Sequence, residues 1–507
     1  MRRFQNFILK CTWRNAVFAA SLIACVIPAG CNVGPDYTRP ETDANASGFV
    51  NRLDADKVLS YDAEEAWWLS FGDETTAELV KQALENNNDL LIAAARVLEA
   101  EALLKRSTGE RLPEVSYSAG RSRSKISFVS PFGGRETFYN TTWSQGLEIS
   151  YIVDFFGRLR RAERAARADL LATEFSRDAL INSIIAQVVI VRIEIATNQR
   201  LLKIAQSDIR NWQQSLEIVE RRYENGLVGP VDLRLARENY AAAKSLEPEL
   251  AQEVELSRHI LDVLLGRRPA AFPEISDTLP RKPGRKVPDT GLPAQLLDRR
   301  PDIKQAELEL VAATERVGVS IAALYPDLTL TASGGYSADH FSDMTNKDAE
   351  VYSAVISLAA PLYQGGKLRA DIAAARARVE QAAGNYSQVI LTAMLEVEDA
   401  LVREKKLNER IAFLEERFEE AKSAEQLAKE RYFRGVEGIL VVLETERRRR
   451  IAENQLTLAI SAIWNARVDL FLALGGNWSL PKDENSKHVR SDGGNYNKEN
   501  IVQNEKN

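Results

Sequence analysis

The residues with catalytic potential are few in this chain and are widely separated. Its three histidines, His259, His340 and His488, share no stretch of sequence. The sequence contains no G-x-S-x-G, H-E-x-x-H, Walker or dinucleotide-binding pattern, the spacings that activate a nucleophile, a metal-bound water or a bound nucleotide. We therefore expect a protein that is not an enzyme and that has no cofactor or metal site.

One cysteine has a possible chemical role. All three cysteines fall within the first 31 residues, which excludes a disulfide framework for the rest of the chain. Basic residues precede an apolar run over 16–27, which ends Pro28-Ala29-Gly30-Cys31 and has the pattern of a secretory signal. The small residues before Cys31 resemble a bacterial lipoprotein cleavage box, which implies removal of 1–30 and lipidation of Cys31. An ordinary signal peptide with an incidental cysteine is the alternative.

The charge of the chain argues against a nucleic-acid partner. The formal net charge is −6, and removal of residues 1–30, which carry four positive charges and no negative ones, would change it to −10. The one basic tract after the leader is Arg447–Arg450, which covers every side of a helical turn and is expected to be solvated or to form inter-helix salt bridges. No later stretch offers 18 uncharged apolar residues, so we expect no transmembrane helix.

The longest predicted element is a helix over 158–225, a range that contains neither Gly nor Pro. Apolar residues recur there with alternating spacings of three and four, which is the pattern of a coiled-coil seam. The series is Ile181, Ile184, Val188, Val191, Ile195, Asn198, Leu202, Ala205, Ile209, Trp212, Leu216, Val219 and Tyr223. A helix of this length would extend for about 100 Å, too long for the core of an ordinary domain.

The same series recurs 209 residues later, which indicates an internal duplication. The second copy is Ile390, Ala393, Val397, Ala400, Glu404, Leu407, Ile411, Leu414, Phe418, Ala421, Glu425, Ala428 and Tyr432. Glu404 and Glu425 are its polar positions. The motif Arg222-Tyr223-x-x-Gly226 likewise recurs as Arg431-Tyr432-x-x-Gly435.

The duplication predicts two elongated repeats of one architecture. A signal peptide over 1–30 and a lipidated arm over 31–78 precede the first repeat, 79–269, with strands at 113–128 and 137–153 and helices at 158–225 and 231–265. A proline-rich linker over 270–293 leads to the second repeat, 294–480, with strands at 326–338 and 350–361 and helices at 366–434 and 439–474. A disordered tail is expected over 481–507.

The predicted strands alternate in polarity. Over 137–153 the odd positions include Tyr139, Trp143 and Leu147, whereas the even positions are mainly polar and include Glu148. This is the pattern of a membrane barrel strand, with Glu148 facing the lumen, although a half-buried sheet in a soluble protein would give the same alternation. The export signal and the long helices favour the membrane. Four strands cannot close a barrel or leave their edges in lipid, so the chain must oligomerise to insert.

Together these features resemble the outer-membrane efflux channel family, the TolC-like proteins, and in particular its lipoprotein branch. The residues that carry this resemblance are Cys31, Gly34-Pro35-Asp36-Tyr37, Pro40, Leu296-Leu297-Asp298-Arg299-Arg300-Pro301-Asp302-Ile303, Ala306-Glu307, the two Arg-Tyr-x-x-Gly motifs and Leu474-Gly475-Gly476-x-Trp478. The resemblance implies an α+β membrane protein of Gram-negative bacteria. Its four strands would join a trimeric 12-stranded outer-membrane barrel, and its helical hairpins would form a periplasmic α-barrel.

The resemblance also implies partners and a function. The protein is expected to be a homotrimer in outer-membrane lipid that docks to a periplasmic adaptor (membrane fusion protein) and an inner-membrane pump of RND type. It would be the exit duct through which such a pump passes drugs or other small molecules. A type I protein secretion channel is the alternative within the family. A periplasmic coiled-coil adaptor or scaffold is the alternative outside it, but this would not explain four strand-like segments at corresponding places in both repeats.

The predicted functional residues lie at the turns between long helices. Carboxylate rings make pore constrictions favour cations, and we expect Glu437 and Glu444 to line the periplasmic aperture. Arg431 and Arg434 are expected to hold a closed state by bonding to a neighbouring helix, with a simple surface role as the alternative for all four. The adaptor is expected to meet the turns at Gly226, Gly229, Gly435 and Gly438.

Overall fold

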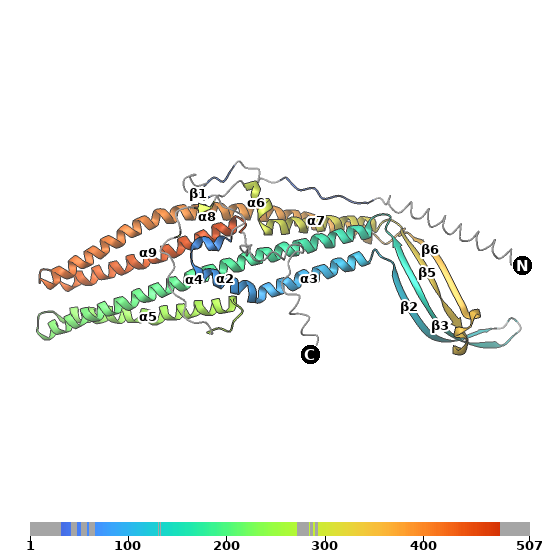
Figure 1. Cartoon of the computed structure of the whole chain (residues 1–507), viewed down its shortest axis with the longest axis horizontal. Helices are drawn as coiled ribbons and strands as arrows, with labels where there is room; N and C mark the ends of the chain where they lie inside the picture. Colours follow the sequence, from blue (N-terminus) through green and yellow to red (C-terminus); the bar gives the residue numbers. More distant parts are fainter. Residues whose placement is uncertain are drawn as a thin grey trace, which may run out of the picture. The chain divides into compact units, whose positions relative to one another are not determined.

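The computed structural model describes residues 32–41, 48–51, 58–59, 66–129, 131, 133–270, 283, 287–288 and 293–476. Cys31, the predicted signal peptide over 1–30, the predicted tail over 481–507 and most of the predicted linker over 270–293 lie outside these residues. Figure 1 shows the elements of the chain, coloured along the sequence from blue at the N-terminus to red at the C-terminus.

The four predicted strands form one antiparallel sheet in the order β2-β3-β5-β6 (Figure 1). Strand β2 is Glu114–Val129, β3 is Arg135–Val153, β5 is Asp327–Ala338 and β6 is Glu350–Ala359. The central pairing joins β3 of the first repeat to β5 of the second, with Ile149 opposite Ala332. The sheet is therefore shared between the repeats, and β2 and β6 are its outer strands.

The register separates the side chains of this sheet into an apolar face and a polar face. Val115, Ile149 and Ala332 lie in one row, and Tyr117 and Leu147 lie in the next row on the same face. The opposite face contains Ser116, Glu148 and Ser333 in one row. Large apolar side chains are exposed on the first face, including Tyr117 at 64%, Leu147 at 55% and Ile356 at 73%. Among the described residues none covers these side chains, as expected for a surface that faces lipid.

The long helices form two hairpins (Figure 1). Helix α4 is Arg158–Glu224 and α5 is Pro230–Leu264; α8 is Lys367–Phe433 and α9 is Ile439–Ala473. The seam residues pack inward, since Ile184, Ile195 and Val219 of α4, and Ile390 and Val397 of α8, are all nearly fully buried. Asn198, the polar member of the first seam, donates a hydrogen bond to Ser257 of α5 at 3.4 Å.

Shorter elements complete the chain. These are η4 (Trp67–Phe71), α2 (Glu74–Asn86), α3 (Asn88–Gly109), α6 (Pro293–Arg299), α7 (Pro301–Ala322), η5 (Phe341–Thr345) and η6 (Lys347–Ala349). Val58–Leu59 and Val287–Pro288 form β1 and β4, a two-residue parallel pairing that the sequence did not indicate.

The chain divides into two compact units, and neither unit corresponds to one sequence repeat. One unit contains 1–41, 97–173 and 305–386, with the whole four-stranded sheet and the first turns of α4 and α8. The other contains 42–96, 174–304 and 387–507, with the rest of both helical hairpins. Each unit thus takes residues from both repeats. The physical reason is that the repeats bury their surfaces on each other: strands pair with strands between repeats, and the apolar seams of the helices pack together.

The main hydrophobic core of the hairpin unit lies between helices. It joins Trp67 and Trp68 of η4 to Ile185 of α4, Leu261 of α5 and Trp464 of α9. Helices α4 and α9 each contain an 18-residue stretch that is apolar enough to cross a membrane by composition, contrary to our expectation of none. However, 67% and 56% of these stretches are buried within the protein. They are accounted for as core segments.

The motifs that carry the family resemblance stabilise the fold. Asp36 of the N-terminal arm lies 2.9 Å from the buried guanidinium of Arg161, which also contacts Glu315 at 2.9 Å. Gly34 has a φ of +105°, and a Cβ there would lie 2.6 Å from the Cα of Gly318, so glycine is required. Arg300 donates a 3.0 Å hydrogen bond to the carbonyl of Ala473, at the end of α9.

Candidate functional site

Both helical hairpins close with the same turn. Gly226 and Gly435 adopt left-handed φ values of +71° and +76°, and each donates a backbone hydrogen bond to the tyrosine carbonyl three residues earlier, at 2.9 and 3.0 Å. Such a conformation is strained for any residue with a Cβ, which explains the glycine in each Arg-Tyr-x-x-Gly motif. Gly229 and Gly438 have extended backbones as N-caps of α5 and α9. Of the four predicted docking glycines, Gly226 and Gly435 are therefore required by the backbone of the turns. The backbone at Gly229 and Gly438 would accept other residues.

The two Arg-Tyr-x-x-Gly motifs are in contact with each other. The guanidinium of Arg222, at the end of α4, lies 4.1 Å from the ring centroid of Tyr432, at the end of α8. Tyr432 is buried, whereas the equivalent Tyr223 of the first repeat is 41% exposed. A cation over an aromatic face is attractive, so this contact joins the two hairpins close to their turns.

The predicted aperture residues lie near the second turn. Arg431 forms a 3.4 Å ion pair with Glu437, so these two residues bond across the turn of their own hairpin. Arg434 has no ion pair within the described part of the chain. Glu444 bonds to Arg447 at 2.8 Å and to Arg448 at 2.7 Å, both on its own helix. Hydrogen bonds from these two arginines lower the pKa of Glu444 to about 2, so it carries a negative charge at any physiological pH.

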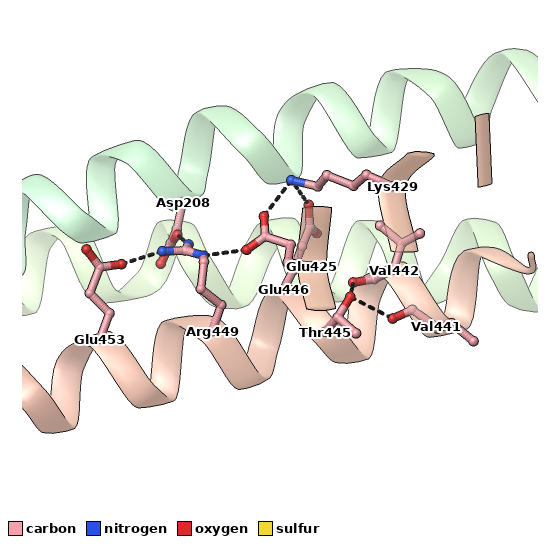
Figure 2. Close-up of polar contacts among 9 residues, drawn as sticks. All are labelled: Asp208, Glu425, Lys429, Val441, Val442, Thr445, Glu446, Arg449 and Glu453. Carbon is pink, nitrogen blue, oxygen red and sulfur yellow. Dashed lines mark hydrogen bonds and ion pairs between the residues drawn. The ribbon is translucent and has the colours of Figure 1, made fainter. Parts of the chain in front are cut away.

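A partly buried charge cluster lies further along the same hairpins (Figure 2). We call it the Arg449 cluster; it contains Asp208 of α4, Glu425 and Lys429 of α8, and Glu446, Arg449 and Glu453 of α9. Arg449 pairs with Asp208, with Glu453 and, through Nε at 2.6 Å, with Glu425. Lys429 lies 2.6 Å from Glu425 and 2.8 Å from Glu446. One arginine thereby joins three helices, which confirms the inter-helix salt-bridge role expected for part of the Arg447–Arg450 run.

The Arg449 cluster has four carboxyl groups for two cationic side chains. Burial raises the pKa of Asp208, Glu446 and Glu453 above the ordinary carboxyl value, and the nearby Arg449 and Lys429 only partly oppose this effect. The pKa of Lys429 is also raised, because its bonds to Glu425 and Glu446 outweigh its burial. Lys429 therefore stays protonated, and the carboxylates of the cluster can take up protons as the pH falls.

The other glutamate of the second seam has an equivalent partner. Glu404 of α8 and Arg467 of α9 are both buried, and they pair through two contacts, at 2.5 and 3.3 Å. Each glutamate that interrupts the apolar seam of α8 thus pairs with an arginine of α9: Glu404 with Arg467 and Glu425 with Arg449. Nothing in the sequence pattern singled out Asp208, Lys429, Glu446 or Glu453.

The two remaining predicted site residues are in different situations. Glu148 lies on the polar face of the sheet between Ser116 and Ser333 and is exposed. Cys31 is outside the described residues. No group of three or more His, Cys, Asp or Glu side chains in the described ranges is placed to hold a metal ion.

Comparisons with known proteins agree with this architecture. The family described as outer membrane efflux protein matches residues 79–267 and 292–476, one match in each repeat. The chain is 30% identical over 468 residues to the toluene efflux pump outer membrane protein TtgF of Pseudomonas putida, which covers 90% of this chain and 96% of the relative. It is 30% identical over 463 residues to the cation efflux system protein CusC of Escherichia coli O6:H1, covering 89% and 96%.

Solved structures show the same fold. The outer-membrane channel OprN superposes with a TM-score of 0.80 at 32% identity, covering 89% of this chain and all of that chain. CusC superposes with a TM-score of 0.76 at 28% identity, covering 88% of this chain and all of that chain.

Proposed function

The chain belongs to the outer membrane efflux protein family, and on that premise we propose that it is the outer-membrane exit duct of a tripartite efflux pump in a Gram-negative bacterium. It would receive drugs or other small molecules from a periplasmic adaptor and an inner-membrane pump of RND type. Relatives are named for toluene, cation and pyoverdine efflux, and this range favours small-molecule cargo over a secreted protein.

The four-stranded sheet is the observation that carries this proposal. It has one exposed apolar face and one polar face, and its outer strands β2 and β6 each leave one edge unpaired within the described residues. Lipid does not tolerate unpaired strand edges, so neighbouring copies must supply the missing partners. Three copies would give twelve strands, with Glu148 and the serine-rich face toward the lumen.

The Arg449 cluster and the two turns suggest how the helical part of the duct is controlled. Asp208 belongs to the first hairpin, and Arg449 and Glu425 to the second, so their ion pairs hold the hairpins together. We assign to this cluster, with Arg431 and Glu437, the role of holding the hairpins in their resting arrangement. Adaptor docking at the Gly229 and Gly438 caps would then loosen it.

Cysteine cross-linking tests the trimer. Ser118 on β2 and Ser353 and Ser357 on β6 all belong to the polar face. Ser118→Cys combined with Ser353→Cys or with Ser357→Cys should give covalent trimers in outer membranes, whereas Ser118→Cys alone can give no more than dimers. Failure of every pairing to give a trimer would refute closure by three copies.

Deletion and complementation test the transport role. A strain without the gene should become sensitive to a defined set of antibiotics, dyes, metals or solvents, and the intact gene should restore resistance. The purified protein should also form conducting channels in planar bilayers. Unchanged sensitivity together with the absence of conductance would reject the duct.

A further inference from the structure

The apolar face of the sheet ends in three cationic side chains of β2. Arg121, Arg123 and Lys125 are alternate residues of β2 and lie on the same face as Val115 and Tyr117. Within the described part of the chain none of the three has a carboxylate partner. Their contacts are aromatic: Arg121 lies 5.2 Å from the ring centroid of Trp143, and Arg123 and Lys125 each lie 5.6 Å from that of Tyr139. We call these five residues the basic aromatic patch.

The register places this patch just beyond the apolar band. On β3, the rows from Val153 to Leu147 are occupied by apolar residues and tyrosine on this face, and the row of Gln145 and Tyr336 follows. The next row contains Arg121 and Trp143. Val153 and Trp143 are ten residues apart, about 33 Å along a strand and about 25 Å in height at a 40° tilt. That height equals the usual apolar band of an outer-membrane barrel, so Arg121 falls at its edge.

The patch lies at the end of the sheet away from the helices. Helix α3 ends at Gly109 before β2, and α4 begins at Arg158 after β3, so the helices join the opposite end. Beyond the patch, β2 continues to Val129, which pairs with Arg135 at the start of β3. If the helices are periplasmic, as the proposed function requires, the patch meets the outer leaflet of the membrane.

Position and charge define the ligand. A cation on the lipid face is strongly disfavoured at the bilayer centre, and this penalty falls toward zero at the interface. Tryptophan and tyrosine prefer the same interfacial level. Among the described strand residues of this face, Glu350 on β6 is the one carboxylate. Within one copy it lies three strands, about 14 Å, from β2. In the proposed trimer, β6 of a neighbouring copy would lie beside β2 and bring its Glu350 next to the patch. The patch therefore has three cations for one carboxylate, and its excess positive charge is available for anions in the headgroup layer.

We propose that the basic aromatic patch binds the phosphorylated headgroup of the glycolipid that forms the outer leaflet of the Gram-negative outer membrane. Arginine donates paired hydrogen bonds to phosphate oxygens, and the lysine adds a point charge. The aromatic rings lie beside the cations, where they hold the long side chains against the sheet. This inference rests on the proposed outer-membrane location.

Lipid retention by the purified full-length protein tests this inference. The protein is incubated in detergent with bisphosphorylated lipid A, with lipid A lacking both phosphates, or with phosphatidylglycerol, and bound lipids are counted by native mass spectrometry. The parent protein should retain bisphosphorylated lipid A most strongly. Arg121→Gln/Arg123→Gln/Lys125→Gln should weaken this binding by about 100-fold, the product of three surface cation contacts.

Two controls separate charge from folding. Arg121→Lys/Arg123→Lys keeps the charges and should retain binding within about tenfold, the loss reflecting the paired hydrogen bonds of arginine. Lys347→Gln, at an exposed lysine of η6, removes one charge and should have no effect, whereas Arg123→Gln alone should weaken binding by about fivefold. Circular dichroism and bilayer conductance identify any variant that has misfolded.

Three results would overturn the inference. They are equal retention by the parent and the triple glutamine variant, equal retention of lipid A with and without phosphates, and equal retention of lipid A and phosphatidylglycerol. The last would indicate a general anionic-lipid surface. Mass spectrometry does not depend on conduction. Absence of channels from the parent would therefore count against the duct, while lipid retention would still decide this inference.

Discussion

Arg449 of the second hairpin forms an ion pair with Asp208 of the first, 241 residues earlier in the chain. Asp208 is 4% exposed and Arg449 15% exposed, so both charges are largely removed from water. Their pairing joins two helices that come from different sequence repeats. An opening motion that separates these helices must break this contact.

Removal of Arg449 should loosen the hairpins. Arg449→Met leaves Asp208 and Glu425 buried without their shared cation, a loss of about 3–5 kcal/mol for a buried pair broken on one side. Hydrogen exchange around residues 208, 425 and 449 should accelerate by about 100-fold or more. Arg448→Met is the matched control, because Arg448 is 68% exposed and bonds only to Glu444 within the described residues. Equal exchange in both variants would show that the cluster does not hold the hairpins.

Mild acid should tighten the Arg449 cluster. Asp208, Glu446 and Glu453 have raised pKa values because of their burial. The folded state therefore binds protons more tightly than the unfolded chain. The resulting stabilisation is present near the ordinary carboxyl pKa of about 4 and is lost as the pH rises through the raised values. Glu444, with a pKa of about 2, stays ionised throughout this range.

Hydrogen exchange measures this pH effect. After correction for the intrinsic pH dependence of exchange, the helices around the cluster should exchange more slowly at pH 5.5 than at pH 7.5. Asp208→Asn/Glu446→Gln should largely remove the difference. Faster corrected exchange at pH 5.5 would mean that the ionised carboxylates, and not the protonated ones, stabilise the closed hairpins.

The two repeats have ion pairs of opposite sense at equivalent positions. Glu220 of α4 lies 2.9 Å from Arg237 of α5, and 209 residues later Lys429 of α8 lies 2.8 Å from Glu446 of α9. The first pair is exposed at 37% and 51%, and Glu446 is only 5% exposed. Double-mutant cycles should give about 0.2–1 kcal/mol for the exposed pair and a larger coupling for Lys429 and Glu446. Equal couplings would argue that burial does not strengthen the second pair.

Glu437 should affect conduction. Glu437→Ala removes a carboxylate that, in three copies, would form a ring near the turns, so cation selectivity and block by divalent cations should both decrease in bilayer recordings. The same substitution frees Arg431, its 3.4 Å partner. Arg431→Ala separates these effects, because it should not reduce cation selectivity if the carboxylate ring is responsible. Unaltered recordings from Glu437→Ala would remove Glu437 from the aperture.

The cap glycines offer a cleaner docking test than the turn glycines. A substitution at Gly435 is strained by its φ of +76°, whereas Gly438 has a φ of −79° and open space around its Cβ position. Gly438→Trp and Gly229→Trp should therefore fold and reach the membrane but abolish resistance by blocking the adaptor. Gly438→Ser is the control and should retain resistance. Full resistance of both tryptophan variants would exclude docking at these caps.

The spacing of apolar residues and the positions of Gly and Pro in the sequence determined most of the fold. The absence of Gly and Pro over 158–225 predicted one helix, and α4 ends at Glu224, one residue before the predicted limit. Odd-even alternation in 137–153 predicted the two faces of β3, because side chains on a strand must alternate. These features are local, since each depends on residues that are neighbours along one element. The functional family also followed from motifs such as Arg431-Tyr432-x-x-Gly435.

Tertiary structure alone decided how the repeats combine. Pairing of β3 with β5 and contact of Asp208 with Arg449 depend on elements that are far apart in sequence, so no local pattern specifies them. The sequence indicated that Glu425 interrupts an apolar seam, but the fold determined that Lys429 and Arg449 both reach it. Likewise, Arg121, Arg123 and Lys125 are ordinary polar residues in the sequence. They form a patch because the register of β2 and β3 places them beside Trp143 and Tyr139, on the face that leads to the apolar band.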